Sequence, residues 1–166
     1  MEAVKIKPMQ QVHWEKVKMI YESGIATGIA TFETTAPSWE KWNNEHLVFA
    51  RLVAFKNNEF VGWAALSQVS NRCVYVGVAE VSVYVGDKHK GKGIGKLLLQ
   101  NLIRESESNG IWTLQAGIFT DNIASVKLHE KVGFRVIGCR ERIGKLKNNW
   151  KDNYILERRS KIVGID

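Results

Sequence analysis

Two neighbouring stretches decide the fold: Val78-Ala79-Glu80-Val81-Ser82-Val83-Tyr84-Val85 and Lys90-Gly91-Lys92-Gly93-Ile94-Gly95. In the first, apolar residues alternate with Glu80, Ser82 and Tyr84 in a period of two, which predicts a β-strand with two different faces. In the second, three glycines lead into a segment with helical periodicity. Together they predict a strand, a tight glycine-rich turn and the start of a helix.

The glycine-rich turn has the composition of an anion-binding site. Glycines let the backbone approach an anion closely, and a helix N-terminus adds unpaired N–H donors and the positive end of its dipole. Four lysines gather there, namely Lys88, Lys90, Lys92 and Lys96. Without an anion, each cation at a helix N-terminus costs roughly 0.3–1 kcal/mol. We therefore expect a polyanionic ligand, such as the pyrophosphate of a coenzyme. The alternative is a solvated lysine-rich loop.

Two other nucleotide-binding loops do not fit the spacing. A Walker loop requires a glycine and a hydroxyl residue where Lys90 and Leu97 stand. A dinucleotide fingerprint requires a third glycine where Lys96 or Leu98 stands.

Composition predicts one soluble domain over residues 1–166. The chain is 45% apolar and 25% charged, has only two prolines, and shows no apolar run long enough to span a membrane. Its first residues lack the pattern of a signal peptide, so we expect a cytoplasmic protein. Cys73 and Cys139 have neither metal-ligand nor disulfide-framework spacing. The net charge of +7 suits nucleic acid or an anionic cofactor, and the clustered lysines favour the cofactor.

The remaining periodicity predicts helices between strands, a mixed α/β order. We expect a tight turn at Asn57-Asn58 and a C-terminal hairpin containing Trp150. Besides the central strand at 78–85, strands are expected at 4–6, 47–55, 60–69, 113–119, 134–143 and 153–158. Helices are expected at 10–26, from 38, at 93–108 and from 121 or 122 to 131.

Glu80 and His129 are the candidate catalytic residues. Glu80 lies in an otherwise apolar strand, where partial burial would increase its tendency to take up a proton; the alternative is a solvated or ion-paired carboxylate. His129 shares a helix face with Asn122 and Ser125, which lie seven and four residues before it. A structural role for a single helical histidine is the alternative.

The sequence resembles the GCN5-related N-acetyltransferase (GNAT) superfamily, and within it the phosphinothricin N-acetyltransferases. The resemblance covers nearly the whole chain. The motifs that carry it are Ala79–Val85 with the glycine-rich turn, Trp112–Phe119, Leu128–Phe134, Gly138–Glu141, Trp150–Asp152 and Leu156–Ser160. Lys90 stands where the family usually has Gln or Arg, and Asn148 where its hairpin usually has Gly.

The resemblance implies a single GNAT-like α/β domain. Its sheet would be mixed but mostly antiparallel, with about six to seven strands and about four flanking helices. It also implies acetyl-CoA as cosubstrate, no metal, Glu80 as catalytic base, and His129 near the thioester. The implied cofactor-binding residues are Val83, Tyr84, Val85, Lys90, Gly91, Lys92, Gly93, Ile94, Gly95, Lys96, Asn122 and Ser125.

For the acceptor, the resemblance implies a pocket formed by the loop after the first helix and the segment before the central strand. The implied residues are Phe32, Glu33, Arg72, Tyr75, Val76 and Trp150. Arg72 would hold a carboxylate or phosphinate. For Phe32 and Trp150 alone, a core or dimer-contact role is the alternative.

The expected function is therefore direct acetyl transfer from acetyl-CoA to the amino group of a small amino acid or analogue, of the phosphinothricin or methionine sulfoximine type. The expected partners are a small-molecule amine and a second copy in a homodimer, without nucleic acid or membrane. A second acceptor class comprises protein N-termini and other amines. Alternatives of a different class are a basic nucleic-acid-binding domain and a non-catalytic acyl-CoA sensor.

Overall fold

The computed structural model describes residues 3–166 and contains one seven-stranded sheet in the order β1-β2-β3-β4-β5-β7-β6. All neighbouring strands are antiparallel except β4 and β5, which are parallel. The strands are β1 (Lys5–Pro8), β2 (Leu52–Lys56), β3 (Glu59–Gln68), β4 (Val78–Val85), β5 (Thr113–Phe119), β6 (Arg135–Leu146) and β7 (Asn149–Arg159). The expected mixed, mostly antiparallel sheet is confirmed.

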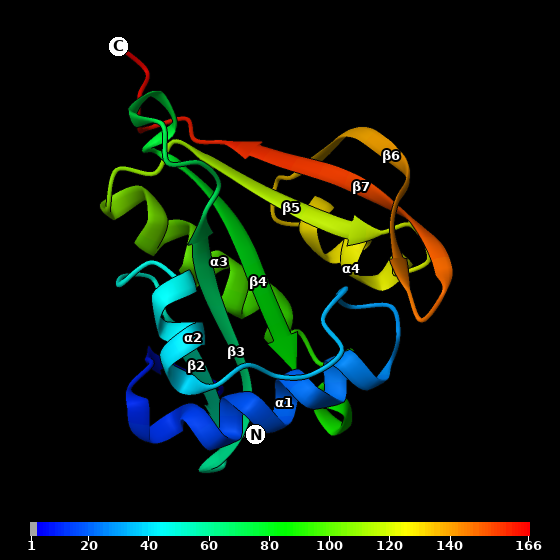
Figure 1. The fold of residues 1–166 in the computed structure, drawn as a ribbon. Coiled ribbons are helices and arrows are strands. Elements are labelled where there is room, and N and C mark those ends of the chain that lie inside the picture. Colours follow the sequence, from blue (N-terminus) through cyan, green and yellow to red (C-terminus); the bar gives the residue numbers. More distant parts are fainter. Residues whose placement is uncertain (1–2) are drawn as a thin grey trace.

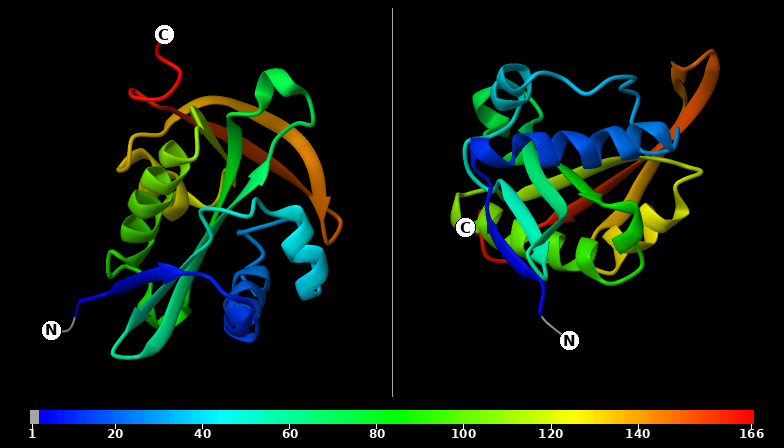
Figure 2. Two further views of the ribbon diagram at one scale, coloured as in Figure 1. Left: turned by 90° about the vertical axis from the view of Figure 1, so that its left-hand side faces the viewer. Right: turned by 90° about the horizontal axis from the view of Figure 1, so that it is seen from below.

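Four α-helices cover the two faces of the sheet, with α1 and α2 on one side and α3 and α4 on the other (Figures 1 and 2). They are α1 (Trp14–Ala26), α2 (Trp39–Glu45), α3 (Ile94–Ser108) and α4 (Ile123–Glu130). Three short 3₁₀ turns are η1 (Gln11–His13), η2 (Cys73–Tyr75) and η3 (Asp87–His89). Within residues 3–166, no helix combines the length and apolar character needed to cross a bilayer.

The side under α3 and α4, here called the aliphatic face, is a closed core. Leu98, Leu99 and Leu102 of α3 are fully buried, since their spacing places them on one side of the helix. They pack against Ala64, Leu66 and other small or branched residues of the sheet. This layer holds the sheet together by apolar burial.

The side under α1 and α2, here called the aromatic face, is built from rings. Trp42 packs against Trp14 at 5.7 Å and Trp63 at 5.8 Å between ring centres. Trp63 stacks on Tyr84 of β4 at 4.9 Å. The polar residues of β4 therefore lie on the aromatic face, and Val81, Val83 and Val85 lie on the aliphatic face.

Several expected boundaries were wrong, for identifiable backbone reasons. The second strand begins at Leu52, because Ala50 adopts a left-handed conformation at φ 53° that interrupts an earlier start. The first helix opens with a 3₁₀ turn before Trp14. The C-terminal turn is Lys147-Asn148, both at positive φ, so Trp150 lies in β7. The turn at Asn57-Asn58 has φ of 50° and 61°, as a tight hairpin requires.

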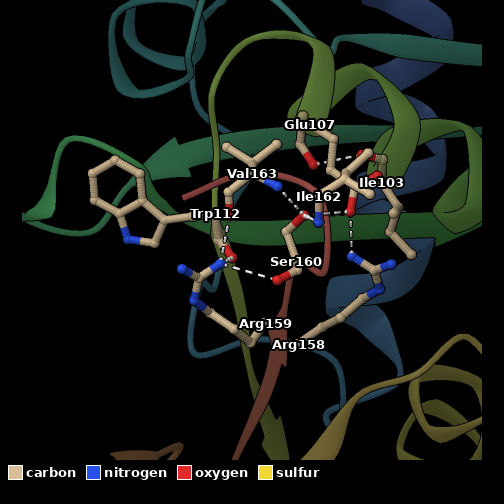
Figure 3. A network of polar contacts seen from close by, with 9 residues as sticks. Ile103, Glu107, Trp112, Arg158, Arg159, Ser160, Ile162 and Val163 are labelled. Carbon is tan, nitrogen blue, oxygen red and sulfur yellow. Dashed lines mark hydrogen bonds and ion pairs between the residues drawn. The ribbon is translucent and has the colours of Figure 1, made fainter. Parts of the chain in front are cut away.

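A polar network anchors the C-terminal segment to α3 and to Trp112, the residue before β5 (Figure 3). Glu107 accepts hydrogen bonds from Arg158 and from the Ser160 hydroxyl, each at 2.9 Å. Arg159 donates to the carbonyl oxygens of Trp112, Ser160 and Val163. The Trp112 ring packs closely on Gly77: a Cβ added to this glycine would lie only 2.1 Å from the ring atom Cε3. The end of the chain thus supports the residues that lead into β4.

Candidate active site

The site lies where β4 and β5 separate. Only Val78–Glu80 of β4 pair with Thr113–Gln115 of β5; beyond Glu80 the two strands diverge (Figure 1). Within the described part of the chain, the edge of β4 from Val81 to Val85 that faces β5 therefore lacks a strand partner, although the other edge of β4 pairs with β3. Such an edge presents peptide N–H and C=O groups to a ligand.

This free edge leads into the glycine-rich turn. Gly91 and Gly93 have φ of 71° and 80°, and a Cβ at either position would meet no atom within 4 Å. The first α-type bond of α3 runs from the Leu97 N–H to the Gly93 carbonyl. The N–H groups of Ile94, Gly95 and Lys96 thus have no partner within the helix. The turn is an open, donor-rich cradle of the kind that binds phosphate.

Lys90, the non-standard residue of the motif, is engaged within the protein. Its Nζ lies 2.5 Å from Asp87 Oδ1, and the Ser23 hydroxyl donates to Asp87 Oδ2 at 2.5 Å. The bond from Lys90, followed by that from Ser23, lowers the pKa of the Asp87 carboxyl. Lys92 donates to the Lys88 carbonyl at 2.7 Å, and Lys96 is exposed. The positive charge of the turn is thus partly held in place by local contacts.

Asn122 is the N-cap of α4, at one of the two positions where this helix was expected to start. Its Oδ1 accepts from the Ser125 N–H at 3.3 Å, and its Nδ2 donates to the Ile29 carbonyl at 3.2 Å. The side chain therefore ties the loop after α1 to the start of α4. Asn122 and Ser125 share this cap, consistent with their spacing.

Glu80 lies at the point of separation, half-buried on the aromatic face. The Gln115 Nε2 donates to its Oε2 at 3.1 Å. Ser82 and Tyr84 follow on the same face, and burial raises the pKa of the Tyr84 phenol far above its ordinary value. Tyr84 therefore stays neutral at physiological pH.

His129 is buried, with 2% of its surface exposed. Its Nδ1 lies 2.8 Å from the Ser125 carbonyl oxygen, and its ring meets Phe134 edge-on at 5.1 Å. Because a carbonyl only accepts, Nδ1 carries the proton, and Nε2 has the free lone pair. Burial lowers the pKa of His129, although the bond to Ser125 opposes the shift. The imidazole is therefore neutral at neutral pH.

A pocket on the aromatic face adjoins β4 at Ser82. The expected Glu33 lines it, but most of its lining was missed by sequence reasoning. The alternation in β4 puts Ser82 on the same face as Glu80, and this pattern could have indicated that Ser82 lines the pocket. The full lining is Tyr21, Glu33, Pro37, Lys41, Trp42, Glu45, His46, Trp63 and Ser82.

The other expected acceptor residues lie in three different parts of the fold. Phe32 stacks edge-on against Phe119 at 4.6 Å and lies against Gly144 of β6. Arg72, Tyr75 and Val76 are exposed just before β4, with the Arg72 guanidinium 5.5 Å from the Tyr75 ring centre. Trp150 is half exposed and has Lys145 over its ring at 4.7 Å.

Curated relatives resemble the chain in sequence. YwnH of Bacillus subtilis, whose name refers to phosphinothricin acetylation, is 34% identical over 87% of this chain and 91% of its own length. The L-methionine sulfoximine/L-methionine sulfone acetyltransferase of Pseudomonas aeruginosa is 35% identical over 57% of this chain and 55% of its own.

Solved structures share the fold. The ribosomal-protein-alanine N-acetyltransferase of Brucella melitensis superposes with a TM-score of 0.87 at 27% identity, over 94% of this chain and 99% of its own. A phosphinothricin acetyltransferase of Sinorhizobium meliloti in complex with acetyl-CoA has a TM-score of 0.88 at 24% identity, over 98% and 91%. The model of the acetyltransferase (GNAT) family matches residues 15–134. This chain therefore belongs to the GNAT family of acetyltransferases.

Proposed function

We propose that this protein transfers the acetyl group of acetyl-CoA to the amino group of a small amino acid or analogue, such as methionine sulfoximine or phosphinothricin. The observation that carries the proposal is the continuous path from Glu80, along the free edge of β4, to the open cradle at Gly91–Lys96. A ligand with peptide-like amides and a pyrophosphate matches this path in shape and in chemistry.

Different residues along the path would bind different parts of acetyl-CoA. Peptide groups of Val83 to Val85 would bind the amides of the pantetheine arm, and the turn with Lys92 and Lys96 would bind the pyrophosphate. Lys90, paired with Asp87, would contribute charge near the phosphates. Asn122 and Ser125 would flank the arm from the start of α4. Bound there, acetyl-CoA supplies a thioester carbonyl open to attack by an amine.

Glu80 is the proposed base. An amine attacks only after losing its ammonium proton, and the Glu80 carboxylate, at the point where β4 and β5 separate, would take it up. As the new C–N bond forms and the C–S bond breaks, CoA would leave as its thiolate and take up the second proton released by the attacking nitrogen, while a backbone N–H of β4 would stabilise the carbonyl oxygen. His129 is proposed as a second proton-handling group. Its neutral ring has Nε2 as the available atom, so it would accept a proton rather than donate one.

The acceptor would bind on the aromatic face, between the loop carrying Phe32 and Glu33 and the segment carrying Arg72, Tyr75 and Val76. Trp150 would close the far side from β7. The small pocket beside Ser82, with its charged and aromatic walls, would border the bound acceptor. Glu33 would attract its ammonium group, and Arg72 its acid group.

The test is steady-state turnover of acetyl-CoA with a panel of amino acids, their sulfoximine and phosphinate analogues, and short peptides. We expect turnover with the analogues and none with peptides. Turnover on peptides alone would favour protein N-termini, an acceptor class suggested by the fold shared with the Brucella melitensis enzyme. Absence of turnover with every amine would contradict the proposal.

We further propose that the enzyme acts as a homodimer in the cytoplasm. Strand β6 lies at the edge of the sheet, and Val136, Ile137 and Ile143 on it are exposed. Exposed apolar residues along an edge strand favour association. Light scattering coupled to size exclusion should give twice the mass of the chain; the monomer mass would exclude the dimer.

A further inference from the structure

Gln115 is a residue that neither the family motif nor the sequence reasoning placed at the reaction centre. Its amide Nε2 lies 3.1 Å from Glu80 Oε2. Among residues 3–166, no other hydrogen bond or ion pair reaches the Glu80 carboxylate. One oxygen of the proposed base is therefore held by an uncharged donor, while Oε1 is left free.

The contact is fixed by the backbone. Glu80 and Gln115 are the last residues at which β4 and β5 pair, and residues paired in register point to the same face. The preceding pair, Ala79 and Leu114, is buried to 0% and 2% exposure. A shift of the β4–β5 register by one residue would expose Ala79 and Leu114. The burial of this pair therefore fixes the position of the Gln115 amide.

The type of side chain matters. A glutamine N–H stabilises a carboxylate and restricts its rotation, yet it carries no charge of its own. A lysine or arginine there would pair with Glu80 and compete with the ammonium group of the acceptor. Glutamine holds the carboxylate in one orientation and keeps its negative charge available.

The row continues beyond Gln115. Register pairs place Ser67, Glu80, Gln115, Glu157 and Arg135 side by side across β3, β4, β5, β7 and β6. Arg135 Nη2 bonds Glu157 Oε1 at 3.0 Å. The amide thus separates Glu80 from a second carboxylate, and an arginine neutralises that carboxylate from the other side.

We propose that Gln115 is a positioning residue for Glu80: it orients the carboxylate so that Oε1 faces the acceptor. This inference rests on the proposed function, in which Glu80 is the base.

The experiment is a double-mutant cycle on the full-length protein with acetyl-CoA and methionine sulfoximine. Gln115→Met keeps the length of the side chain and removes the donor. We expect kcat to fall by about tenfold, the scale of a hydrogen bond to a charged group, with an unchanged KM for acetyl-CoA. In a Glu80→Gln background the same change should alter kcat by less than about twofold, because the group it positions is gone.

Two further variants separate positioning from general damage. Gln115→Asn keeps the amide but draws it back by one methylene, and should lose activity in the same direction. Gln68→Met is the matched control on β3, where the amide donates to the Ser70 carbonyl, and should leave kcat unchanged. Circular dichroism and melting temperature check that each variant is folded.

The outcomes are distinguishable. If Glu80→Gln lowers kcat and Gln115→Met does not, or if Gln115→Met acts equally in both backgrounds, the positioning role is overturned and the base survives. If Glu80→Gln leaves kcat unchanged, the proposed base is wrong and the positioning role falls with it.

Discussion

The two faces of the sheet are built by different means. On the aliphatic face, Leu98, Leu99 and Leu102 are fully buried and the layer is closed. On the aromatic face, the indole N–H groups of Trp42 and Trp63 are buried beside a pocket and have no hydrogen-bond partner among residues 3–166. Buried donors without a partner lower the free energy of unfolding, so the polar groups of this face reduce its contribution to stability. Stability should therefore reside mainly under α3, and chemistry mainly under α1 and α2.

The largest expected effect concerns the aromatic face. Glu80→Gln should lower kcat by roughly 10²–10⁴-fold, the range of general acid–base catalysis, because the amide cannot take up the ammonium proton. Binding of acetyl-CoA, measured by calorimetry, should be largely kept, and the free energy of unfolding should hardly change. A decrease in the free energy of unfolding as large as the increase in the activation free energy would contradict the assignment of chemistry to one face and stability to the other.

The reverse pattern is expected for the aliphatic face. Leu102→Ala should reduce the free energy of unfolding by about 2–5 kcal/mol, because it leaves a cavity in a closed layer. Urea denaturation measures this loss, with the half-buried Leu97→Ala as a milder control on the same helix. Folded protein at low temperature should retain its kcat. A Leu102→Ala variant that is stable but inactive would contradict this view.

Each face also holds a histidine bonded in the same way, half-buried at His46 and buried at His129. His46 Nδ1 lies 2.7 Å from the Trp42 carbonyl oxygen, and His129 Nδ1 lies 2.8 Å from that of Ser125. Burial is the main cause that lowers both pKa values below the ordinary 6.5. Arg51 lowers that of His46 further, whereas the backbone bonds oppose the shifts.

Acidification should therefore weaken the protein from both faces. The unfolded chain binds protons more tightly than the folded one, so unfolding is favoured as pH falls below 6.5 toward the folded pKa values. The contribution of the two histidines to the pH dependence fades above 6.5 and is absent from about one pH unit higher. Urea denaturation across this range should show a shallower decline for His129→Gln, which cannot titrate. An equal decline in this variant would exclude His129 as a source.

The smallest effect is expected for Trp42→Phe. The change loses apolar area in the aromatic layer, but it also removes a buried N–H that has no partner. These terms oppose each other, so the free energy of unfolding should change by no more than about 1.5 kcal/mol. Thermal unfolding measures it. A loss as large as that of Leu102→Ala would show that both faces carry equal weight.

Sequence reasoning located what depends on local pattern. The alternation of 78–85, the helix after Gly93 and the Asn57-Asn58 turn all follow from neighbouring residues, and the structure has them in place. It could not find Gln115 beside Glu80, because that contact requires β5 to lie next to β4. It also missed Trp42 and Trp63 in the pocket, since their depth depends on how α2 packs on the sheet.

The free edge of β4 has a consequence for how such enzymes diversify. A donor substrate recognised through peptide groups is recognised by atoms that every amino acid provides, so substitutions along Val81–Val85 need not change it. In the proposed site, the acceptor is selected by side chains on the aromatic face. A lineage can therefore exchange one amine for another in few mutational steps while its use of the donor stays constant.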